Sequence, residues 1–156
     1  MSTSPSTLAS TVGVDVAGYL RGGLGLGQAA RLYVAALQAG GIPVRTTTVD
    51  LRMPEVHGDD GTRAELKTTD FTDLAFEGDL PFNLVCVNAP ELPRFYSDVG
   101  PNFFAGKRTI GVWAWEVDKV PDDWSWAFGV VDEIWTYSQY VVDVLRPVSN
   151  LSLIHI

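Results

Sequence analysis

Short segments typical of β-strands alternate with segments typical of helices about five times along this chain. The strand-like segments are rich in β-branched and apolar residues, whereas the helical segments carry an apolar stripe at helical spacing. The expected strands are 12–18, 44–49, 82–88, 109–115 and 132–137. The expected helices are 28–39, a short one at 89–93, one that ends at 128, and one at 139–146. The alternation predicts an α/β fold, a three-layer Rossmann-like domain with a mainly parallel sheet.

Two parts of the chain fall outside this pattern. Residues 51–80 are rich in turn-forming residues, and we expect a long excursion with little regular structure. Residues 1–11 lack the basic start and the apolar stretch of a signal peptide, so we expect a disordered leader. The domain is then expected to occupy residues 12–150, in a cytoplasmic protein.

The final hexapeptide, residues 151–156, reads LSLIHI. It matches the translation of CTG TCT CTT ATA CAC ATC, the end of a transposon adapter used in DNA library preparation. We expect an artefactual tail that is excluded from the fold, and the alternative is a real short β-strand. If the tail is artefactual, the chain is the first part of a longer protein.

Composition and charge exclude several classes of protein. Hydrophobic residues make up 46% of the chain and charged residues 19%, which favours a folded domain over a disordered chain. The formal net charge of −8 argues against a nucleic-acid binder, because phosphate neutralisation needs clustered Lys and Arg. The single cysteine, Cys86, excludes an internal disulfide framework and a cysteine-based zinc site. No apolar run is long enough to span a membrane, and no spaced ligand set predicts a metal site.

A glycine-rich loop between the first strand and the first helix carries the sharpest chemical signal. Four glycines lie within residues 22–27. Ligands of parallel sheets bind outside the carboxyl ends of the strands, where this loop is expected. Glycines let the backbone approach a ligand, and free N–H groups at a helix start face anions. The loop therefore predicts phosphate or diphosphate binding, with Arg21 and Arg31 adding charge, and a merely flexible turn is the alternative.

The same loop has a second interpretation, as a dinucleotide fingerprint. Residues 25–30 fit the pattern G-x-G-x-x-A, and Asp50 ends the next strand. In that fingerprint the first glycine follows the strand at once, whereas here about six residues separate Gly25 from the strand end near Gly18. The spacing therefore counts against a nicotinamide or flavin site.

The end of the fourth expected strand is also unusual. Alternation sends Trp113 and Trp115 to one face and leaves Glu116 near the strand end. Aromatic rings can stack on a sugar or lipid, and a carboxylate can hold a hydroxyl or a proton. For the two tryptophans we favour a place in a tryptophan-rich core over a binding role. For Glu116 an exposed residue without a function is the alternative.

Four blocks of the sequence, taken in order, resemble the N-terminal domain of bacterial glycosyltransferases of family 4, which have the GT-B fold. The blocks read VAGYLRGGLGLGQAARLYVAALQAGGIPV, FNLVCVNAPELP, TIGVWAWEVDKVPDDWSWAF and VDEIWTYSQYVVDVL. The likeness covers residues 12–146, apart from the excursion at 51–80.

The resemblance implies an enzyme with two Rossmann-like domains that face each other across a cleft. Such enzymes move a sugar from a nucleotide-diphosphate sugar to a carbohydrate or lipid-linked acceptor, are generally retaining, and need neither a metal nor another cofactor. It also implies that Gly22, Gly23, Gly25 and the adjacent Arg21 approach the donor diphosphate.

The N-terminal domain of these enzymes mainly binds the acceptor, which places Asn88, Glu91 and Trp115 on the acceptor side. Many relatives have a histidine near the end of the fourth strand. Trp115 and Glu116 occupy that region here, which leaves Glu116 as the catalytic candidate and no histidine role to transfer.

The resemblance also implies a donor-binding C-terminal domain with an E-x7-E glutamate pair, and we expect this domain to be absent from residues 1–156. We therefore expect the fragment alone to be inactive. Cytoplasmic location is expected, with attachment to the inner face of the membrane as the alternative. Two other functions stay open: a nicotinamide-dependent oxidoreductase domain, and a non-catalytic Rossmann-like binding module.

Overall fold

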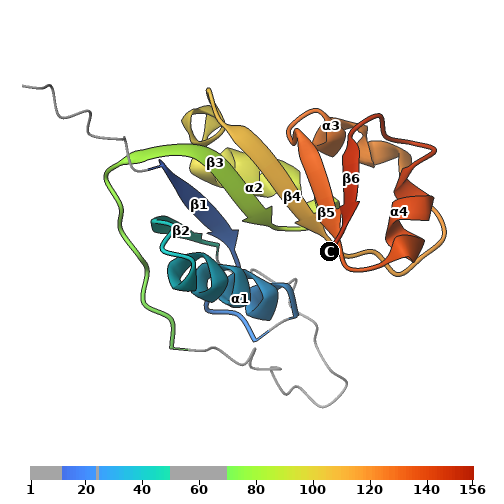
Figure 1. Cartoon of the computed structure of the whole chain (residues 1–156). Helices are drawn as coiled ribbons and strands as arrows, with labels where there is room; N and C mark the ends of the chain where they lie inside the picture. The colour runs from blue at the N-terminus through green and yellow to red at the C-terminus, as the bar shows by residue number, and fades with distance from the viewer. Residues whose placement is uncertain (1–11, 24, 50–69) are drawn as a thin grey trace, which may run out of the picture.

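The computed structural model describes residues 12–23, 25–49 and 70–156 (Figure 1). The chain has a Rossmann-like three-layer α/β fold with a six-stranded parallel sheet in the order β2-β1-β3-β4-β5-β6. The strands are β1 (Val12–Gly18), β2 (Val44–Thr48), β3 (Asp79–Cys86), β4 (Arg108–Trp113), β5 (Glu133–Thr136) and β6 (Ser152–His155). The helices are α1 (Gly25–Ala39), α2 (Leu92–Val99), α3 (Ser125–Phe128) and α4 (Gln139–Leu145). Short 3₁₀ turns are η1 (Ala89–Glu91), η2 (Pro101–Phe103) and η3 (Asp122–Trp124).

The predicted fold class is confirmed. The first strand pairs parallel to residues 44–48, with Val14 opposite Val44 and Gly18 opposite Thr48. Two predicted helix signals are confirmed as well. Gly41 adopts a φ of 71°, the left-handed conformation that ends α1, and Ser138 caps α4 by accepting a hydrogen bond from the Val141 N–H.

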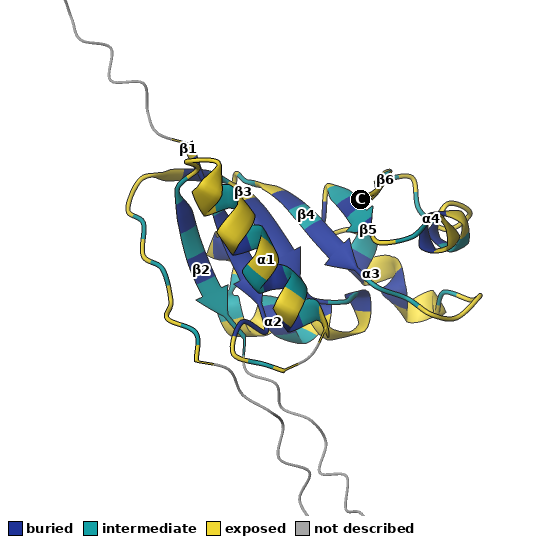
Figure 2. Ribbon diagram, turned by 60° about the horizontal axis from the view of Figure 1, so that its bottom comes forward, coloured by how far each residue is buried: buried dark blue, intermediate teal, exposed yellow. Residues whose placement is uncertain are grey.

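The two faces of the sheet carry separate hydrophobic cores. α1 packs on β1, β2 and β3, and its Ala30 and Val34 meet Val16 and Leu84. The helices α2, α3 and α4 cover the other face, where Trp113 lies at the centre of a second core. Figure 2 shows that burial is greatest in the strands between these layers. All-parallel sheets are covered in this way because the crossover helices lie on their faces.

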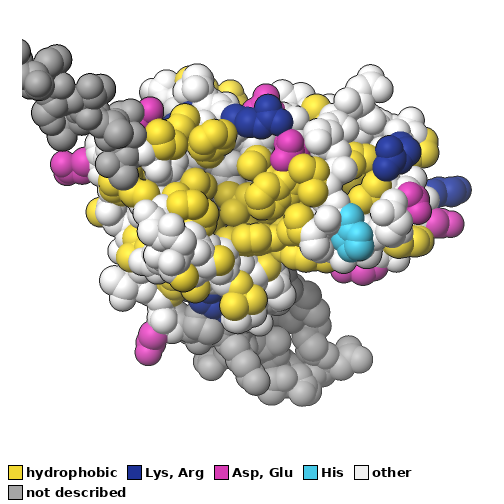
Figure 3. All heavy atoms as spheres, viewed as in Figure 1, with side chains coloured by type: hydrophobic (Ala, Val, Ile, Leu, Met, Phe, Trp, Pro, Cys, Tyr) yellow, Lys and Arg dark blue, Asp and Glu magenta, His cyan; other side chains and the backbone are white. Residues whose placement is uncertain are grey.

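One part of the α1 side of the sheet is not covered. Among the described residues, α1 is the only helix on this side, and it stops short of β5 and β6. We call the uncovered apolar surface the open face; Figure 3 shows it as a hydrophobic area beside α1. It is formed by exposed or half-buried side chains of β3 to β6 and of the residue after β5. These are Phe82, Ile110, Trp135, Tyr137 and Ile154.

A buried polar row crosses the opposite side of the sheet, near the amino ends of the strands. Asp15 is completely buried and accepts hydrogen bonds from the Arg45 guanidinium and from Thr47 Oγ1 at 3.0 Å. Lys107 Nζ lies 3.9 Å from Asp15 Oδ2 and 3.3 Å from Asn83 Oδ1. Burial lowers the pKa of Lys107, and the nearby Asp15 carboxylate partly offsets this. The row is internally paired, which is how a sheet tolerates a buried charge.

Several element boundaries differ from the sequence predictions. β3 begins at Asp79, inside the excursion predicted for 51–80, and ends at Cys86 instead of residue 88. β2, β5 and α4 are each one or two residues shorter than predicted.

Three further differences concern β4, α1 and α2. The fourth strand ends at Trp113 instead of Trp115, because the Ala114 N–H donates to Asn88 Oδ1 at 2.8 Å instead of continuing the ladder. α1 begins at Gly25, three residues before the predicted start. The short helix expected at 89–93 is η1 followed by α2, which continues to Val99 because Leu92 and Phe95 bury one face of it.

Most of the predicted excursion lies outside the described residues, because 50–69 are not described. The predicted leader at 1–11 also lies outside the described residues. Residues 70–78 form no helix or strand and run beside β2. The Thr46 N–H donates to Leu74 O at 3.0 Å, and the Leu74 N–H donates to Thr46 Oγ1 at 2.8 Å. This segment therefore occupies hydrogen-bonding groups on the outer edge of the sheet.

The final residues form β6, which pairs parallel to β5 with Trp135 opposite Ile154. The short strand considered as the alternative for LSLIHI is thus what the structure contains. Any short apolar segment with β-branched residues can pair with an edge strand in this way, so the pairing does not reveal the origin of the hexapeptide. The adapter origin of these residues stays a prediction. Within the described ranges, no helix is long and apolar enough to cross a membrane.

Candidate functional site

All strands end at the same edge of the sheet, so the loops that follow them lie along one side of the molecule (Figure 1). The chain leaves β1 for β2 on one side, and β3 lies on the other side of β1. Ligands of open parallel sheets bind at such a switch point, outside the carboxyl ends. A ligand-binding site is therefore expected at the loops after β1 and β3.

The loop after β1 folds into a tight turn, residues 19–23, which we call the glycine turn. The Gly22 N–H donates to Tyr19 O at 2.8 Å. The turn rests on the first turn of α1, where a Cβ on Gly27 would lie 2.7 Å from Gly22 O and even closer to Tyr19 O. Gly27 is therefore required by close backbone packing. By contrast, a Cβ on Gly25 would meet no atom within 4 Å.

Arg31 projects from α1 to the glycine turn. Its Nη1 donates to Leu20 O at 2.9 Å and to Gly22 O at 3.0 Å, and its Nη2 donates to Gln28 Oε1 at 2.8 Å. The sequence prediction gave Arg31 a role in adding charge for a ligand. The structure instead shows this guanidinium bound to the backbone of the turn.

Arg21, the other predicted cation, pairs with Asp73 from the segment beside β2. Asp73 also accepts a hydrogen bond from Thr48 Oγ1 at the end of β2. Both partners of the Arg21 pair are about half exposed, with side-chain exposures of 49% and 44%. Exposed pairs of this kind stabilise a protein by about 0–1 kcal/mol, so a bound anion can replace Asp73 at little cost.

The structure does not support the interpretation of this loop as a dinucleotide-binding fingerprint. β1 ends at Gly18 and α1 begins at Gly25, so the first fingerprint glycine does not follow the strand at once. Close contact between α1 and β1 occurs instead at Gly18, where a Cβ would lie 3.3 Å from Ala30 Cβ. Asp50, which the fingerprint would use, lies outside the described residues.

Asn88 joins the ends of two neighbouring strands. Its Oδ1 accepts the Ala114 N–H at 2.8 Å, which ties the loop after β3 to the loop after β4. The next polar residue, Glu91, is exposed and lies in a small niche with Tyr19 and Arg94. Burial raises the pKa of Tyr19, and the Glu91 carboxylate raises it further. Asn88 and Glu91 are thus both at the predicted edge, and Glu91 lies beside Tyr19 of the glycine turn.

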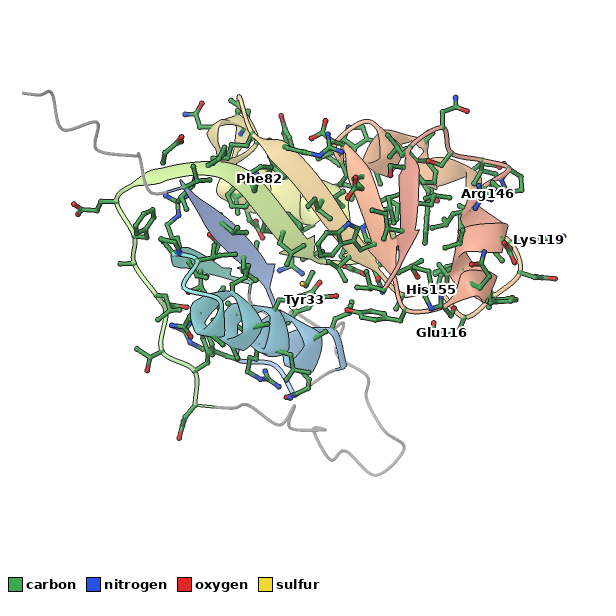
Figure 4. All side chains as sticks on the ribbon, in the orientation of Figure 1. Tyr33, Phe82, Glu116, Lys119, Arg146 and His155 are labelled. Carbon is green, nitrogen blue, oxygen red and sulfur yellow. The ribbon has the colours of Figure 1, made fainter. Side chains whose placement is uncertain are left out.

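Trp115 is part of the core on the α2 to α4 side. Its ring packs 4.4 Å from Trp124 in an edge-to-face arrangement, and its Nε1 donates to Lys119 O at 2.9 Å. This contact supports the core alternative and fixes the loop that carries Glu116. Glu116 itself is exposed at the carboxyl edge (Figure 4), and among the described residues no partner binds its carboxylate.

Sequence reasoning missed an aromatic cluster on the α1 side of this edge. The hydroxyl group of Tyr33 interacts with that of Tyr137, and the Tyr33 ring lies 6.3 Å from that of Trp135. Burial raises the pKa of both tyrosines. Trp135 Nε1 in turn donates to Glu133 Oε1 at 2.6 Å. Tyr33 belongs to the apolar stripe of α1, and no signal in the sequence showed that its hydroxyl would meet the end of β5 (Figure 4).

Two other features are not part of the candidate site. A hollow of about 440 Å³ lies between η3, α3 and residues 148–151, which lead into the amino end of β6. Cys86, at the end of β3, is buried, and burial raises the pKa of its thiol to about 12. Within the described ranges, no group of three or more His, Cys, Asp or Glu side chains could hold a metal ion.

Comparison of the chain with protein-family models, with curated proteins and with solved structures gave no match.

Proposed function

We propose that this chain is the acceptor-side half of a glycosyltransferase that uses a nucleotide-diphosphate sugar. The observation that carries the proposal is the glycine turn at the carboxyl end of β1, at the switch point of a parallel sheet. Its closely packed backbone and the exchangeable Arg21 suit a diphosphate, because backbone amides and a guanidinium are good donors to phosphate oxygens. The resemblance of the four sequence blocks supplies the reaction class.

In the proposed reaction, the bond between the anomeric carbon and the diphosphate oxygen breaks, and a bond to the acceptor oxygen forms. The leaving diphosphate takes the electron pair, and donors at the glycine turn stabilise its charge. The acceptor hydroxyl loses its proton, for which the exposed Glu116 carboxylate is the candidate base. Asn88, Glu91 and Trp115 stay the proposed acceptor-side residues, with Trp115 acting by fixing the loop.

The second half of the cleft would come from a further domain of the full-length protein. It would hold the base and ribose of the donor and supply the remaining cations. The uninterrupted gene tests this part directly. We expect the reading frame to continue past Asn150 into a second Rossmann-like domain with an E-x7-E pair. A frame without such a domain would favour a non-catalytic binding module.

The enzyme encoded by the uninterrupted gene should release a nucleotide diphosphate when given its sugar donor and a carbohydrate or lipid acceptor. In Gly23→Val, a side chain would hold the phosphate away from the backbone, and kcat/KM for the donor should fall about a hundredfold. Gly40→Ala is the matched control, because Gly40 is exposed just after α1, away from the glycine turn, and a Cβ there would come no closer than 3.4 Å to another atom. Equal kcat/KM for the two variants at equal melting temperature would remove the turn from the site. Residues 1–156 alone should release no more nucleotide than the same residues carrying Gly23→Val.

A further inference from the structure

We infer that Arg31 is a positioning residue, which orients two peptide groups of the glycine turn so that the N–H groups of Arg21 and Gly23 face a bound diphosphate. The inference rests on the proposed function, since it concerns how that turn presents its donors. It also changes which amides are expected to act, because Gly22 is then not one of them.

The contacts of Arg31 determine the shape of the turn. One nitrogen, Nη1, reaches both Leu20 O and Gly22 O, at 2.9 and 3.0 Å. The other, Nη2, donates to Gln28 Oε1 at 2.8 Å, which fixes the plane of the guanidinium. Because this group is planar and rigid, two carbonyls that bind one of its nitrogens are held in a common direction.

The orientation of the carbonyls determines the orientation of the amides. A trans peptide group is planar, and its C=O and N–H point in opposite directions. With Leu20 O and Gly22 O directed at Arg31, the N–H groups of Arg21 and Gly23 point to the other side of the turn. The Gly22 N–H between them donates to Tyr19 O within the turn. Two amides on one side of a turn form the kind of concavity that binds phosphate oxygens.

The two arginines therefore have different roles. Arg31 is bound by three protein oxygens, so direct contact with a ligand would leave backbone carbonyls of the turn without a donor. Arg21 has an exposed carboxylate partner, Asp73, which an anion can replace. Arg31 thus acts through the backbone, whereas Arg21 is available for direct contact.

The test uses residues 1–156 labelled with ¹⁵N, and inorganic pyrophosphate as the probe at physiological ionic strength. In the wild type, the Arg21 and Gly23 amide signals should shift saturably during the titration, and the Gly22 signal should shift least. Arg31→Lys keeps the charge but cannot bridge two carbonyls rigidly, so pyrophosphate affinity should fall about tenfold. The pyrophosphate affinity of Arg31→Gln should fall to a similar extent. Asp73→Asn should bind pyrophosphate more tightly than the wild type does.

Amide hydrogen exchange gives a second readout that needs no ligand. In Arg31→Lys, exchange at Gly22 should accelerate about tenfold because the turn loosens, while Val34 within α1 should be unchanged. Unchanged Gly22 exchange and wild-type affinity in Arg31→Lys would overturn the inference and leave the proposed function intact. A wild-type turn that does not respond to pyrophosphate, although Arg31→Lys speeds Gly22 exchange, would overturn the diphosphate role itself.

Discussion

Two glycines in the first turn of α1 have opposite structural requirements. A methyl group on Gly27 would collide with the carbonyls of the glycine turn, whereas one on Gly25 would enter free space. We expect Gly27→Ala to reduce the free energy of unfolding by about 1–3 kcal/mol, as overpacking does. Gly25→Ala should raise it by about 0.5–1 kcal/mol, because alanine restricts the unfolded chain and favours the helix. Urea unfolding of both variants measures this, and equal stability of the two would contradict the close contact.

The buried thiol of Cys86 should be chemically silent in the folded protein. Burial raises its pKa from 9.0 to about 12. At pH 8 the thiolate, which is the reactive form, is then about a thousandfold scarcer than in an exposed cysteine with the ordinary pKa. Iodoacetamide labelling, followed by mass spectrometry, should be complete in urea and negligible in buffer. Rapid labelling of the native protein would show that the end of β3 opens to solvent.

The same shift has a consequence for stability. The folded state favours the neutral thiol, so its contribution is fully present below pH 9.0 and is lost as the pH rises towards about 12. Cys86→Ala should remove this part of the alkaline loss of stability, which unfolding curves between pH 8 and pH 11 would detect.

At the scale of elements, the sheet depends on the buried charge that joins β1 to β2. Asp15 faces Arg45 and Lys107, so Asp15→Ala would leave two cations without their shared carboxylate. Loss of one partner from a buried ion pair costs about 3–5 kcal/mol. The exposed pair of Arg94 and Asp98 is the matched control, and Asp98→Ala should cost less than about 1 kcal/mol. Similar urea midpoints for the two variants would mean that Asp15 does not stabilise the sheet.

The elements could be predicted from the sequence where local patterning determines them. Val12–Gly18 forms β1 at its predicted bounds, and Ser138 caps α4 as expected, because both depend on neighbouring residues. The end of β4 could not be predicted, since a side chain from another loop, Asn88, takes the Ala114 amide. Phe95 could have indicated the longer α2, because it follows Leu92 at helical spacing and shares its buried face.

The candidate site was predictable only in its location. The glycine pattern placed a turn at the carboxyl edge, but the roles within that turn depend on contacts between distant residues. Arg31 reaches back eleven positions to Leu20 O, and Asp73 reaches Arg21 from the segment beside β2. Contacts between residues so far apart in the sequence cannot be predicted from periodicity or composition. For the same reason, the interaction between Tyr33 and Tyr137 was not foreseen.

At the scale of the whole molecule, the open face should govern how the chain behaves in solution. Exposed Phe82, Tyr137 and Ile154 lie on a side of the sheet that α1 covers only in part. Continuous apolar surface of this kind binds hydrophobic dyes and promotes association. We expect residues 1–156 to enhance ANS fluorescence and to show concentration-dependent light scattering. Ile154→Lys should reduce both signals, whereas Leu32→Lys, on the exposed side of α1, should reduce neither.

The position of β1 between β2 and β3 affects how the protein is made. β1 ends at residue 18, but its neighbour β3 begins only at residue 79, so one side of the first strand has no partner until half of the chain exists. At about 5–20 residues per second, a ribosome needs roughly 3 to 12 seconds to cross that interval. During this time β1 can pair only with β2, and a two-stranded unit is marginally stable in water. The nascent chain is therefore most vulnerable to aggregation and proteolysis before β3 emerges, which makes the timing of synthesis part of how this sheet is assembled.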